Sequence, residues 1–501
     1  MTRHWLQKRG ITWLCGAVIL LLWAVPGRAD YTVIDTNQTA CYDNDVEILC
    51  PNLGDAFYGQ DSQYTSTVPQ YQDNGDGTVT DLSTGLMWQK TPDQDGDGDL
   101  DSDDKLSFDD AVAAAPGCQL AGYVDWRLPT IKELYSLMDF NGVDPSGASG
   151  TPPDLVPFID TDYFDFVYGD EGTGERLIDA QYWSSTEYVS TTMGGDATAF
   201  GVNFADGRIK GYPSEPVGPP GEEFLMTSFV RFVRGNPSYG SNAFVDNGDG
   251  TVTDEATGLM WMKTDSGEGM AWEDALVYAE SLEYAGYSDW RLPDAKELQS
   301  IVDYTRSPDT TGSAAIDPVF NVTAIIDEGG TTNYPFYWTG TTHINISDYP
   351  GTFAAYVCFG EALGWMQPPG GGSYILMDVH GAGAQRSDPK SGDPGSYPYG
   401  HGPQGDVVRI TNYVRCVRSA EPGPDPTPTP GECLNHGDVT LDGMHTATDA
   451  QLAFLIALGS YSPSFEEACA ADCSGDGSVT AGDAQTIFLA VLGSGQCADP
   501  L

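Results

Sequence analysis

Apolar residues spaced three and four apart predict the same amphipathic helix at two places in the chain. Thr130 and Glu133 stand three residues apart where the first helix begins, a spacing that satisfies free backbone amides reciprocally. Asp294 and Glu297 repeat this capping box at the second helix. The two apolar stripes consist of Ile131, Leu134, Leu137 and Met138, and of Ala295, Leu298, Ile301 and Val302.

A hairpin and a shorter helix are predicted upstream of each of these helices. The segment DNGDGTVTD occurs at 73–81 and again at 246–254, and its Asn-Gly and Asp-Gly pairs favour the positive φ of a tight turn. A calcium loop is excluded there, because its first ligand would be Gln72 or Val245. The shorter helix is expected over 108–115 in the first copy and over 272–282 in the second.

Four motifs recur in the same order, so the chain contains a tandem repeat. They are DNGDGTVTD with TGLMW, DWRLP with KEL, the pair YW, and a closing VR-x-VR. The spacing between them drifts, which indicates two copies of one domain that differ by loop insertions. The copies span 71–235 and 244–419, each a normal size for a domain with its own core, after an N-terminal segment at 30–70.

These motifs resemble the C-terminal domain family of the Legionella collagen-like adhesin, and the resemblance covers both copies. It implies C-type-lectin-like folds and adhesive, glycan-binding modules. A third part follows the proline-rich segment 420–431, in which alternating prolines favour an extended spacer. The expected class is therefore α+β, with two tandem C-type-lectin-like domains and a small all-α module at 432–501 that resembles a dockerin or EF-hand.

The terminal module carries two 12-residue loops with oxygen ligands at calcium-loop positions and glycine at position 6. Each loop leads into an apolar helix, and aspartate rather than glutamate closes it. This arrangement resembles a dockerin, which implies two bound Ca²⁺ ions and a cohesin-type partner. The alternative is a pair of acidic turns. The predicted ligands are Asp438, Thr440, Asp442, Met444 and Asp449 in the first loop, and Asp472, Ser474, Asp476, Ser478 and Asp483 in the second.

A third acidic loop at 93–104 is an insertion, because the second copy has only a short TDSGEG segment there. It fills positions 1, 3, 5, 9 and 12 of a calcium loop with aspartate and keeps glycine at position 6. One further Ca²⁺ is predicted, against the alternative of a solvated acidic loop. The ligands are taken from Asp93, Asp95, Asp97, Asp99 and Asp104.

Charge and the N-terminal segment bear on location and partners. The chain has 22 basic and 73 acidic residues and a net charge of −51, which disfavours nucleic-acid and anionic-membrane partners. The acid excess is explained by calcium ligation, by solubility in a salty medium, or by both. Residues 1–29 read as a secretory signal, with an uncleaved anchor as the alternative, and no later stretch is long enough to span a membrane. We expect a secreted or cell-surface protein.

Ten cysteines suit an oxidising compartment. Cys358 and Cys416 align with Asn203 and Phe232 of the first copy, so we expect them to form a disulfide present only in the second. Cys41 and Cys50 are expected to close a small loop, and Cys118 has no obvious mate. Three pairings remain open among the cysteines of the terminal module, Cys433, Cys469, Cys473 and Cys497.

Ligand recognition is expected in the insertion after Pro368, because loops carry function and aromatic faces suit sugar rings. A structural role is favoured over a ligand site for the WRLP tryptophans and arginines, since such an arginine usually pairs with a buried carboxylate. These four residues are Trp126, Arg127, Trp290 and Arg291, and the candidate recognition residues are Tyr374, His380, Tyr397, Tyr399 and His401.

No catalytic motif was found, although His343, His380 and His401 could meet and a carboxylate pair is not visible in sequence. The leading hypothesis is a non-catalytic adhesive protein that binds extracellular polysaccharide or glycoconjugate and docks through its tail. The alternatives are a polysaccharide-degrading enzyme carrying a dockerin and a structural surface protein without a glycan ligand.

Overall fold

The chain forms two compact units, each of which is treated by itself. The first comprises Met1–Cys50 and Gly59–Arg418, and the second Pro51–Tyr58 and Ser419–Leu501. The predicted signal and the proline-rich linker beyond residue 420 lie outside the described residues. The computed structural model describes residues 31–148, 152, 155–219, 221–368, 371–420, 437, 439–440, 446–458, 461, 470–471, 473, 479–491 and 497.

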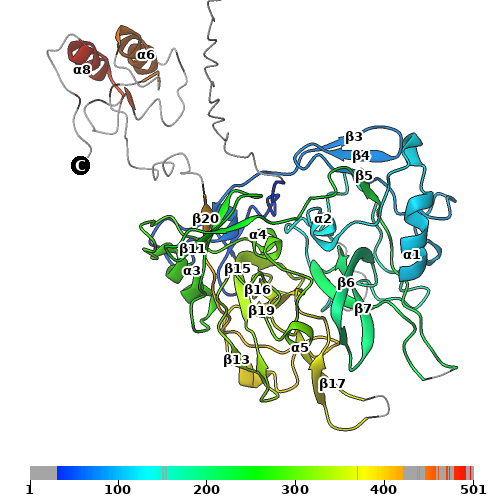
Figure 1. The fold of residues 1–501 in the computed structure, drawn as a ribbon. Helices are drawn as coiled ribbons and strands as arrows, with labels where there is room; N and C mark the ends of the chain where they lie inside the picture. Colours follow the sequence, from blue (N-terminus) through cyan, green and yellow to red (C-terminus); the bar gives the residue numbers. More distant parts are fainter. Residues whose placement is uncertain are drawn as a thin grey trace, which may run out of the picture. The chain divides into compact units, whose positions relative to one another are not determined.

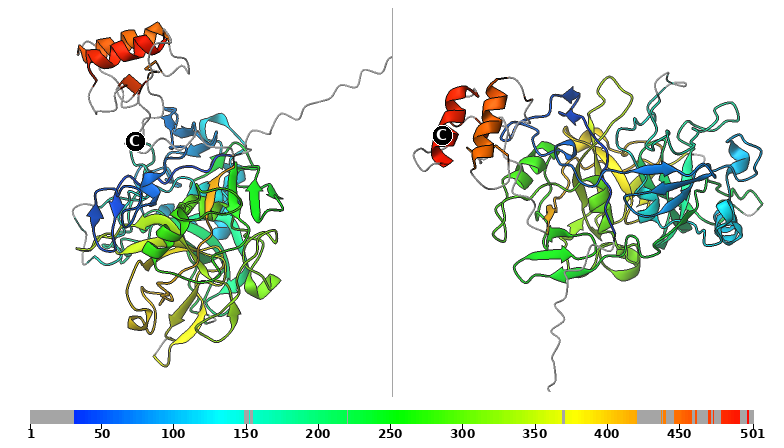
Figure 2. Two further views of the ribbon diagram at one scale, coloured as in Figure 1. Left: turned by 90° about the vertical axis from the view of Figure 1, so that its left-hand side faces the viewer. Right: turned by 90° about the horizontal axis from the view of Figure 1, so that it is seen from above.

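One antiparallel six-stranded sheet runs through both repeats of the first unit (Figure 1). Its order is β15-β16-β19-β8-β7-β6, so three strands of the second repeat continue into three of the first. Figure 2 shows the same ribbon turned by 90° about the vertical axis and seen from above. The strands are β6 (Gln181–Thr192), β7 (Asp196–Asn203), β8 (Arg208–Pro213), β15 (Phe336–His343), β16 (Phe353–Cys358) and β19 (Gln385–Pro389).

The sheet order is palindromic, and its centre is the pair Ile209 and Gln385, where β8 meets β19. Ile209 pairs with Val202 within the first repeat, and Gln385 pairs with Val357 in the second. Ile209 and Gln385 are therefore equivalent positions of the two copies. Because side chains alternate along a strand, the residues after them, Lys210 and Arg386, lie on the opposite face from buried Ile209.

The predicted hairpins are confirmed, and each belongs to a four-stranded sheet closed by the VR-x-VR segment. Gly75 and Gly77 adopt φ of 73° and 88°, the positive values expected of the Asn-Gly and Asp-Gly turn. The sheets are β3 (Tyr71–Asp73), β4 (Thr78–Asp81), β5 (Met87–Gln89) and β9 (Val233–Arg234), and β10 (Phe244–Asp246), β11 (Thr251–Asp254), β12 (Leu259–Met262) and β20 (Val417–Ser419).

The helices begin where the sequence predicts, and both capping boxes form. The fold is mixed α and β with few helices, consistent with the α+β class. The helices of the first unit are α1 (Phe108–Ala114), α2 (Ile131–Tyr135), α3 (Trp272–Glu280), α4 (Ala295–Ser300) and α5 (Pro308–Thr311). The 3₁₀ turns are η1 (Asp61–Gln63), η2 (Ser102–Asp104), η3 (Ala115–Gly117), η4 (Leu120–Gly122) and η5 (Pro394–Ser396). The first unit also contains two-stranded antiparallel ribbons, which are β1 (Cys41–Tyr42) with β2 (Glu47–Ile48), β13 (Ile325–Ile326) with β14 (Thr332–Asn333), and β17 (Leu363–Met366) with β18 (Ile375–Asp378).

The expectation that each repeat has a separate core is wrong, because one hydrophobic cluster contains buried residues of both. The ring of Phe200 packs edge-on against Tyr304 of the other repeat, with centroids 4.9 Å apart. The Tyr135 hydroxyl also donates to Gln385 Oε1 at 3.1 Å across the same boundary. Matching sequence motifs predict two copies, but they do not say whether the copies pack against each other.

Two buried lysines join the repeats reciprocally at α2 and α4. Lys132 Nζ donates at 2.6 Å to the carbonyl of Ser300, the last residue of α4. Lys296 Nζ donates to the carbonyl of Ser136 at 3.0 Å and to that of Asp35 at 2.9 Å. Burial lowers the pKa of both lysines to about 8. Each helix end is thus satisfied by a charged donor from the other repeat.

The N-terminal segment binds across the two repeats. Gln38 donates from Nε2 to the carbonyls of Phe140 and Thr342, at 3.2 and 2.7 Å. The buried carboxylate of Asp61 accepts from the Thr341 hydroxyl at 2.5 Å. Residues 31–50 and 59–70 therefore belong to the same folded unit as the repeats.

The predicted disulfide between Cys358 and Cys416 is wrong, because both residues are buried free thiols. Cys358 ends β16 in the six-stranded sheet, whereas the Cys416 carbonyl accepts from Met262 in the four-stranded sheet around β12. Their places in different sheets explain why joint absence from the first copy did not mean pairing. Burial raises the pKa of both thiols.

The remaining cysteines after residue 29 are those of the N-terminal segment, Cys118 and the terminal module. The predicted disulfide between Cys41 and Cys50 is confirmed. Cys118 is a free cysteine. In the second unit Cys473 bonds to Cys497, which selects one of the three open pairings, while Cys433 and Cys469 lie outside the described residues.

The described part of the second unit consists chiefly of two helices, α6 (Ala447–Ala457) and α8 (Ala481–Val491). Their first residues are 34 apart (481 − 447), the same offset as the two predicted calcium loops. Ala453 and Ile487 lie in the small buried cluster between them. In neither unit is any described helix long and apolar enough to cross a membrane.

Candidate functional site

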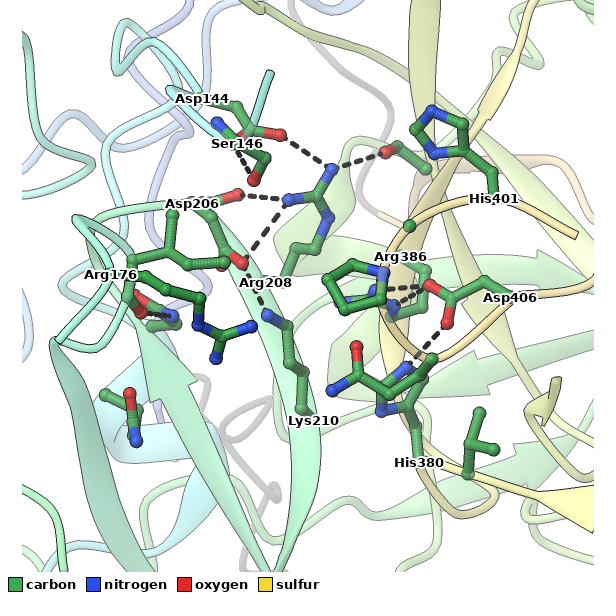
Figure 3. A pocket seen from close by; sticks show the side chains of 18 of the residues that line it. Asp144, Ser146, Arg176, Asp206, Arg208, Lys210, His380, Arg386, His401 and Asp406 are labelled. Carbon is green, nitrogen blue, oxygen red and sulfur yellow. Dashed lines mark hydrogen bonds and ion pairs between the residues drawn. The ribbon is translucent and has the colours of Figure 1, made fainter. Parts of the chain in front are cut away.

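A cavity of about 810 Å³ lies between the two repeats, on the side of the six-stranded sheet opposite the core (Figure 3). Its volume falls within the roughly 300–1,000 Å³ typical of small-ligand pockets. Residues from β6, β7, β8, β16 and β19 and from several connecting segments of both repeats line it. Its charged and imidazole-bearing side chains are Asp144, Arg176, Asp196, Asp206, Arg208, Lys210, His380, Arg386, Asp388, His401 and Asp406.

Arg208 is held by carboxylates and by a side chain of the other repeat. Its Nη2 lies 2.7 Å from Asp144 Oδ2, and its Nη1 lies 3.4 Å from Asp206 Oδ2. The same Nη2 donates to Ser387 Oγ at 3.2 Å. Burial opposes ionisation of Asp144, but Arg208 and His343 lower its pKa to about 2, so it is a carboxylate at neutral pH.

Asp206 is the second carboxylate of this network. Lys210, on β8, donates to its Oδ2, as Figure 3 shows. His343, buried on β15 of the other repeat, contacts the Asp206 carbonyl through Nε2 at 2.9 Å. Burial lowers the pKa of His343 to about 4, and the imidazole is therefore neutral.

Asp406 forms a second network in the same cavity. Arg386 contacts its Oδ2 through Nε, at 2.9 Å, and through Nη2. His380 Nε2 lies 2.9 Å from its Oδ1. Burial disfavours the charge of Asp406, yet Arg386 and His380 hold its pKa far below its usual range. Burial lowers the pKa of His380 to about 4, so Asp406 is charged and His380 is neutral at pH 7.

Some buried polar atoms of these lining residues lack a hydrogen-bond partner among the described residues. They are Asp206 Oδ1, His380 Nδ1 and Arg386 Nη1. Buried polar groups in native proteins are nearly always paired with protein, water or ligand. The side chains are otherwise fixed by ion pairs, so they form a preorganised polar wall.

The five candidate recognition residues are only partly brought together. His380 and His401 line the cavity, and the His401 ring lies 5.7 Å from that of Phe353, another lining residue. Tyr374 and Tyr399 instead stack on each other at 4.1 Å and remain partly exposed. Tyr397 contacts the edge of His401, with centroids 6.3 Å apart. The insertion therefore contributes both to the cavity and to an exposed aromatic pair.

The structural role expected of the WRLP motifs is confirmed. Trp126 and Trp290 are buried. Arg127 pairs with the buried carboxylate of Glu133, and Arg291 pairs with that of Glu297. These contacts place the motif in the core of each copy and away from the cavity lining.

The most informative cavity residues were missed by sequence reasoning. Asp144, Asp206, Arg208, Arg386 and Asp406 belong to no repeated motif and lie far apart in the chain. They meet only because β8 pairs with β19. The one available signal is compositional, since three of the few basic residues of an acidic chain occur in two short strands.

The acidic insertion at 93–104 brings several predicted calcium ligands together. Oxygens of Asp93, Asp95 and Asp97 lie within 4.8 Å of one another. Asp104 is buried and accepts from the backbone amides of Gln94 and Asp101, at 2.6 and 3.0 Å. Asp99 is not part of this group. Three carboxylates so close together fit the oxygen ligands that Ca²⁺ prefers.

Only part of the tail loops is described. Thr440 Oγ1 donates to Asp449 Oδ1 at 2.7 Å, which brings two predicted ligands of the first loop into contact. In the second loop, Asp483 Oδ2 accepts from the Thr480 amide at 2.8 Å. The remaining ligands lie outside the described residues: Asp438, Asp442, Met444, Asp472, Ser474, Asp476 and Ser478.

Comparison with known proteins establishes the family. The profile of the Lcl C-terminal domain matches residues 77–219 and 250–368, which together make up more than half of the chain. The protein therefore belongs to the Lcl C-terminal domain family, with one domain match in each repeat. This membership makes it a surface or adhesin-like protein. No curated protein and no solved structure is found to match the chain.

Proposed function

We propose that this protein is a secreted or surface-held adhesin that binds an extracellular glycan in the cavity between its repeats. The observation that carries the proposal is the cavity itself, which is built from both copies and lined by fixed polar groups. Phe353 and Tyr212 add aromatic surface to the same lining. Hydrogen-bonding groups that fix orientation, combined with aromatic faces, are the features by which a pocket recognises a sugar.

A glycan array probed with the full-length secreted protein tests this proposal. Gln404 is a half-buried lining residue whose side chain is not part of either ion-pair network. Gln404→Trp should obstruct the cavity and abolish binding. Gln119→Trp, at an exposed position of the first repeat, should leave binding unchanged. An array on which nothing binds, with the protein shown to be folded, would reject glycan binding and favour a structural role.

The exposed pair Tyr374 and Tyr399 provides an internal comparison. Its rings are available to stack on a sugar outside the cavity. If Tyr374→Ala with Tyr399→Ala abolishes glycan binding while Gln404→Trp does not, the aromatic pair is the binding surface instead of the cavity. In the proposed arrangement the double variant weakens binding at most modestly.

The same proposal assigns calcium to the acidic loops and a docking role to the tail. The contact of Thr440 with Asp449 supports a dockerin-like first loop. Helices α6 and α8 expose equivalent apolar pairs, 34 residues apart, that suit a protein partner such as a cohesin-type domain. The pairs are Phe454 and Leu455, and Phe488 and Leu489.

Titration of the full chain with calcium tests the metal assignment. We expect two sites in the tail and one at 93–104, and Asp449→Ala and Asp93→Ala should each remove one. A cohesin-type domain should bind the wild-type tail only with calcium present, because metal binding to such loops is coupled to their folding. A calcium stoichiometry unchanged by Asp449→Ala would contradict the dockerin likeness. C-type-lectin-like topology in each repeat is part of the same proposal.

A further inference from the structure

The positive charges on the cavity wall are all paired with carboxylates. Each basic side chain that lines the cavity lies within ion-pair distance of a carboxylate. Two further lining carboxylates, Asp196 and Asp388, have no such basic partner among the ion pairs of the described residues. The pairs are Arg176 with Asp179, Arg208 with Asp144, Lys210 with Asp206, and Arg386 with Asp406.

This pairing argues against an anionic ligand. A carboxylate or sulfate approaching Arg208 or Arg386 would also approach the aspartates that already neutralise them, and like charges in a partly buried site repel strongly. The net charge of −51 adds long-range repulsion of polyanions. A site that binds an anion needs basic side chains whose N–H donors are not already used. The ion pairs of this cavity leave few such donors.

The unpartnered polar atoms of the lining residues include both a donor and acceptors. Arg386 Nη1 is a donor and Asp206 Oδ1 is an acceptor. The neutral imidazole of His380 donates through Nε2 to Asp406, which leaves Nδ1 as a second acceptor. The protein around them screens these atoms from solvent, but they show that the lining residues offer donors and acceptors together. A sugar hydroxyl both donates and accepts, so it matches such a lining, whereas an anionic group only accepts.

Resting on the proposed glycan-binding function, we infer that the cavity selects uncharged saccharides and excludes sugars that carry carboxylate or sulfate groups. The half-buried amide of Gln404 adds a neutral donor and acceptor to the lining. Specificity against acidic sugars then arises from fixed aspartates, which penalise the wrong ligand.

The test compares matched oligosaccharides that differ only in oxidation of C6, for example cellobiose and its uronic acid, by calorimetry on the full-length protein. The neutral member of the best-binding pair should bind at least about tenfold more tightly. Its affinity should change little between about 50 and 500 mM salt, since no net charge is neutralised on binding. Tighter, salt-sensitive binding of the acidic member would overturn the inference while leaving glycan binding intact.

Asp406→Asn sharpens the test by removing one of the excluding charges. The variant frees Arg386 and should improve binding of the uronic acid by about tenfold relative to wild type. Asp125→Asn is the matched control, because Asp125 makes the same two-contact pair with Arg234 but is 57% exposed and outside the cavity. An unchanged preference in a folded Asp406→Asn protein would show that charge does not set the selectivity. If no saccharide of either kind binds, both the inference and the proposed function fail.

Discussion

Replacing Lys296 by methionine tests the reciprocal lysine contacts that join the repeats. Lys296 is buried and donates to the Ser136 and Asp35 carbonyls, and burial lowers its pKa from 10.5 to about 8. Lys132 faces the equivalent carbonyl of Ser300 and has the same lowered pKa. Each charged lysine therefore costs stability, which its hydrogen bonds offset in part.

The size of the effect follows from the pKa difference. A shift of 2.5 units, at about 1.4 kcal/mol per unit, makes the charged form of Lys296 cost about 3 kcal/mol in the folded state. Between pH 8 and 10.5 the unfolded chain binds more protons than the folded one, so this lysine makes stability rise with pH. Below pH 8 the full cost is present. Over the accessible range from pH 8 to 9.5 the gain is about 2 kcal/mol.

Urea unfolding of wild type and Lys296→Met at several pH values measures this contribution. Subtracting the two free energies of unfolding cancels the other titrating groups, including the buried cysteines and tyrosines. Methionine leaves two carbonyls without a donor, but that penalty is independent of pH. The wild type should gain about 2 kcal/mol relative to the variant between pH 8 and 9.5.

Lys263→Met is the control, since Lys263 pairs with Asp246 at the partly exposed edge of a hairpin. Its free-energy difference from wild type should stay nearly constant with pH because surface pairs contribute little. A constant difference for Lys296→Met as well would refute the argument that a buried charged lysine joins the repeats.

Two further predictions concern the second copy. Arg415→Met should lower the free energy of unfolding by about 3 to 5 kcal/mol in urea titrations, because its buried guanidinium donates to three backbone carbonyls. Arg418→Met, which loses a half-exposed partner, should cost about 1 kcal/mol, and equal losses would contradict this reasoning. Thiol labelling of the unfolded, unreduced protein should mark both Cys358 and Cys416. Detection of a disulfide-linked peptide that contains both cysteines would contradict this expectation.

The parts of the fold that sequence predicts well are those fixed by neighbouring residues. The capping boxes at Thr130 and Asp294 form because side chain and backbone amide are three residues apart. The hairpin at Gly75 forms because its turn requires positive φ. The paired arginines at Arg127 and Arg291 also follow, since their carboxylates lie six residues away.

What sequence does not predict is how the two copies meet. The pairing of Ile209 with Gln385 joins strands 176 residues apart (385 − 209). The pattern of apolar and polar residues in either strand does not identify the strand with which it pairs. The wrong prediction of a disulfide between Cys358 and Cys416 has the same origin. Aligning the two copies identifies equivalent positions, but it gives no distance between two residues of one copy. Only the strand pairing shows that Cys358 belongs to the six-stranded sheet while Cys416 lies beside β12 of a four-stranded one.

The duplication matters for function because neither copy contains the cavity alone. Lys210 and Arg386 are equivalent positions, yet they pair with different carboxylates: Asp206 comes from the turn between β7 and β8, and Asp406 comes from the segment after β19. A symmetric dimer of one repeat could supply only identical halves, whereas fusion lets the two halves diverge. Because the two halves of the cavity differ in their donors and acceptors, the cavity is suited to a ligand whose two halves also differ. The tandem pair, and not the single domain, is therefore the unit to which a binding function should be assigned.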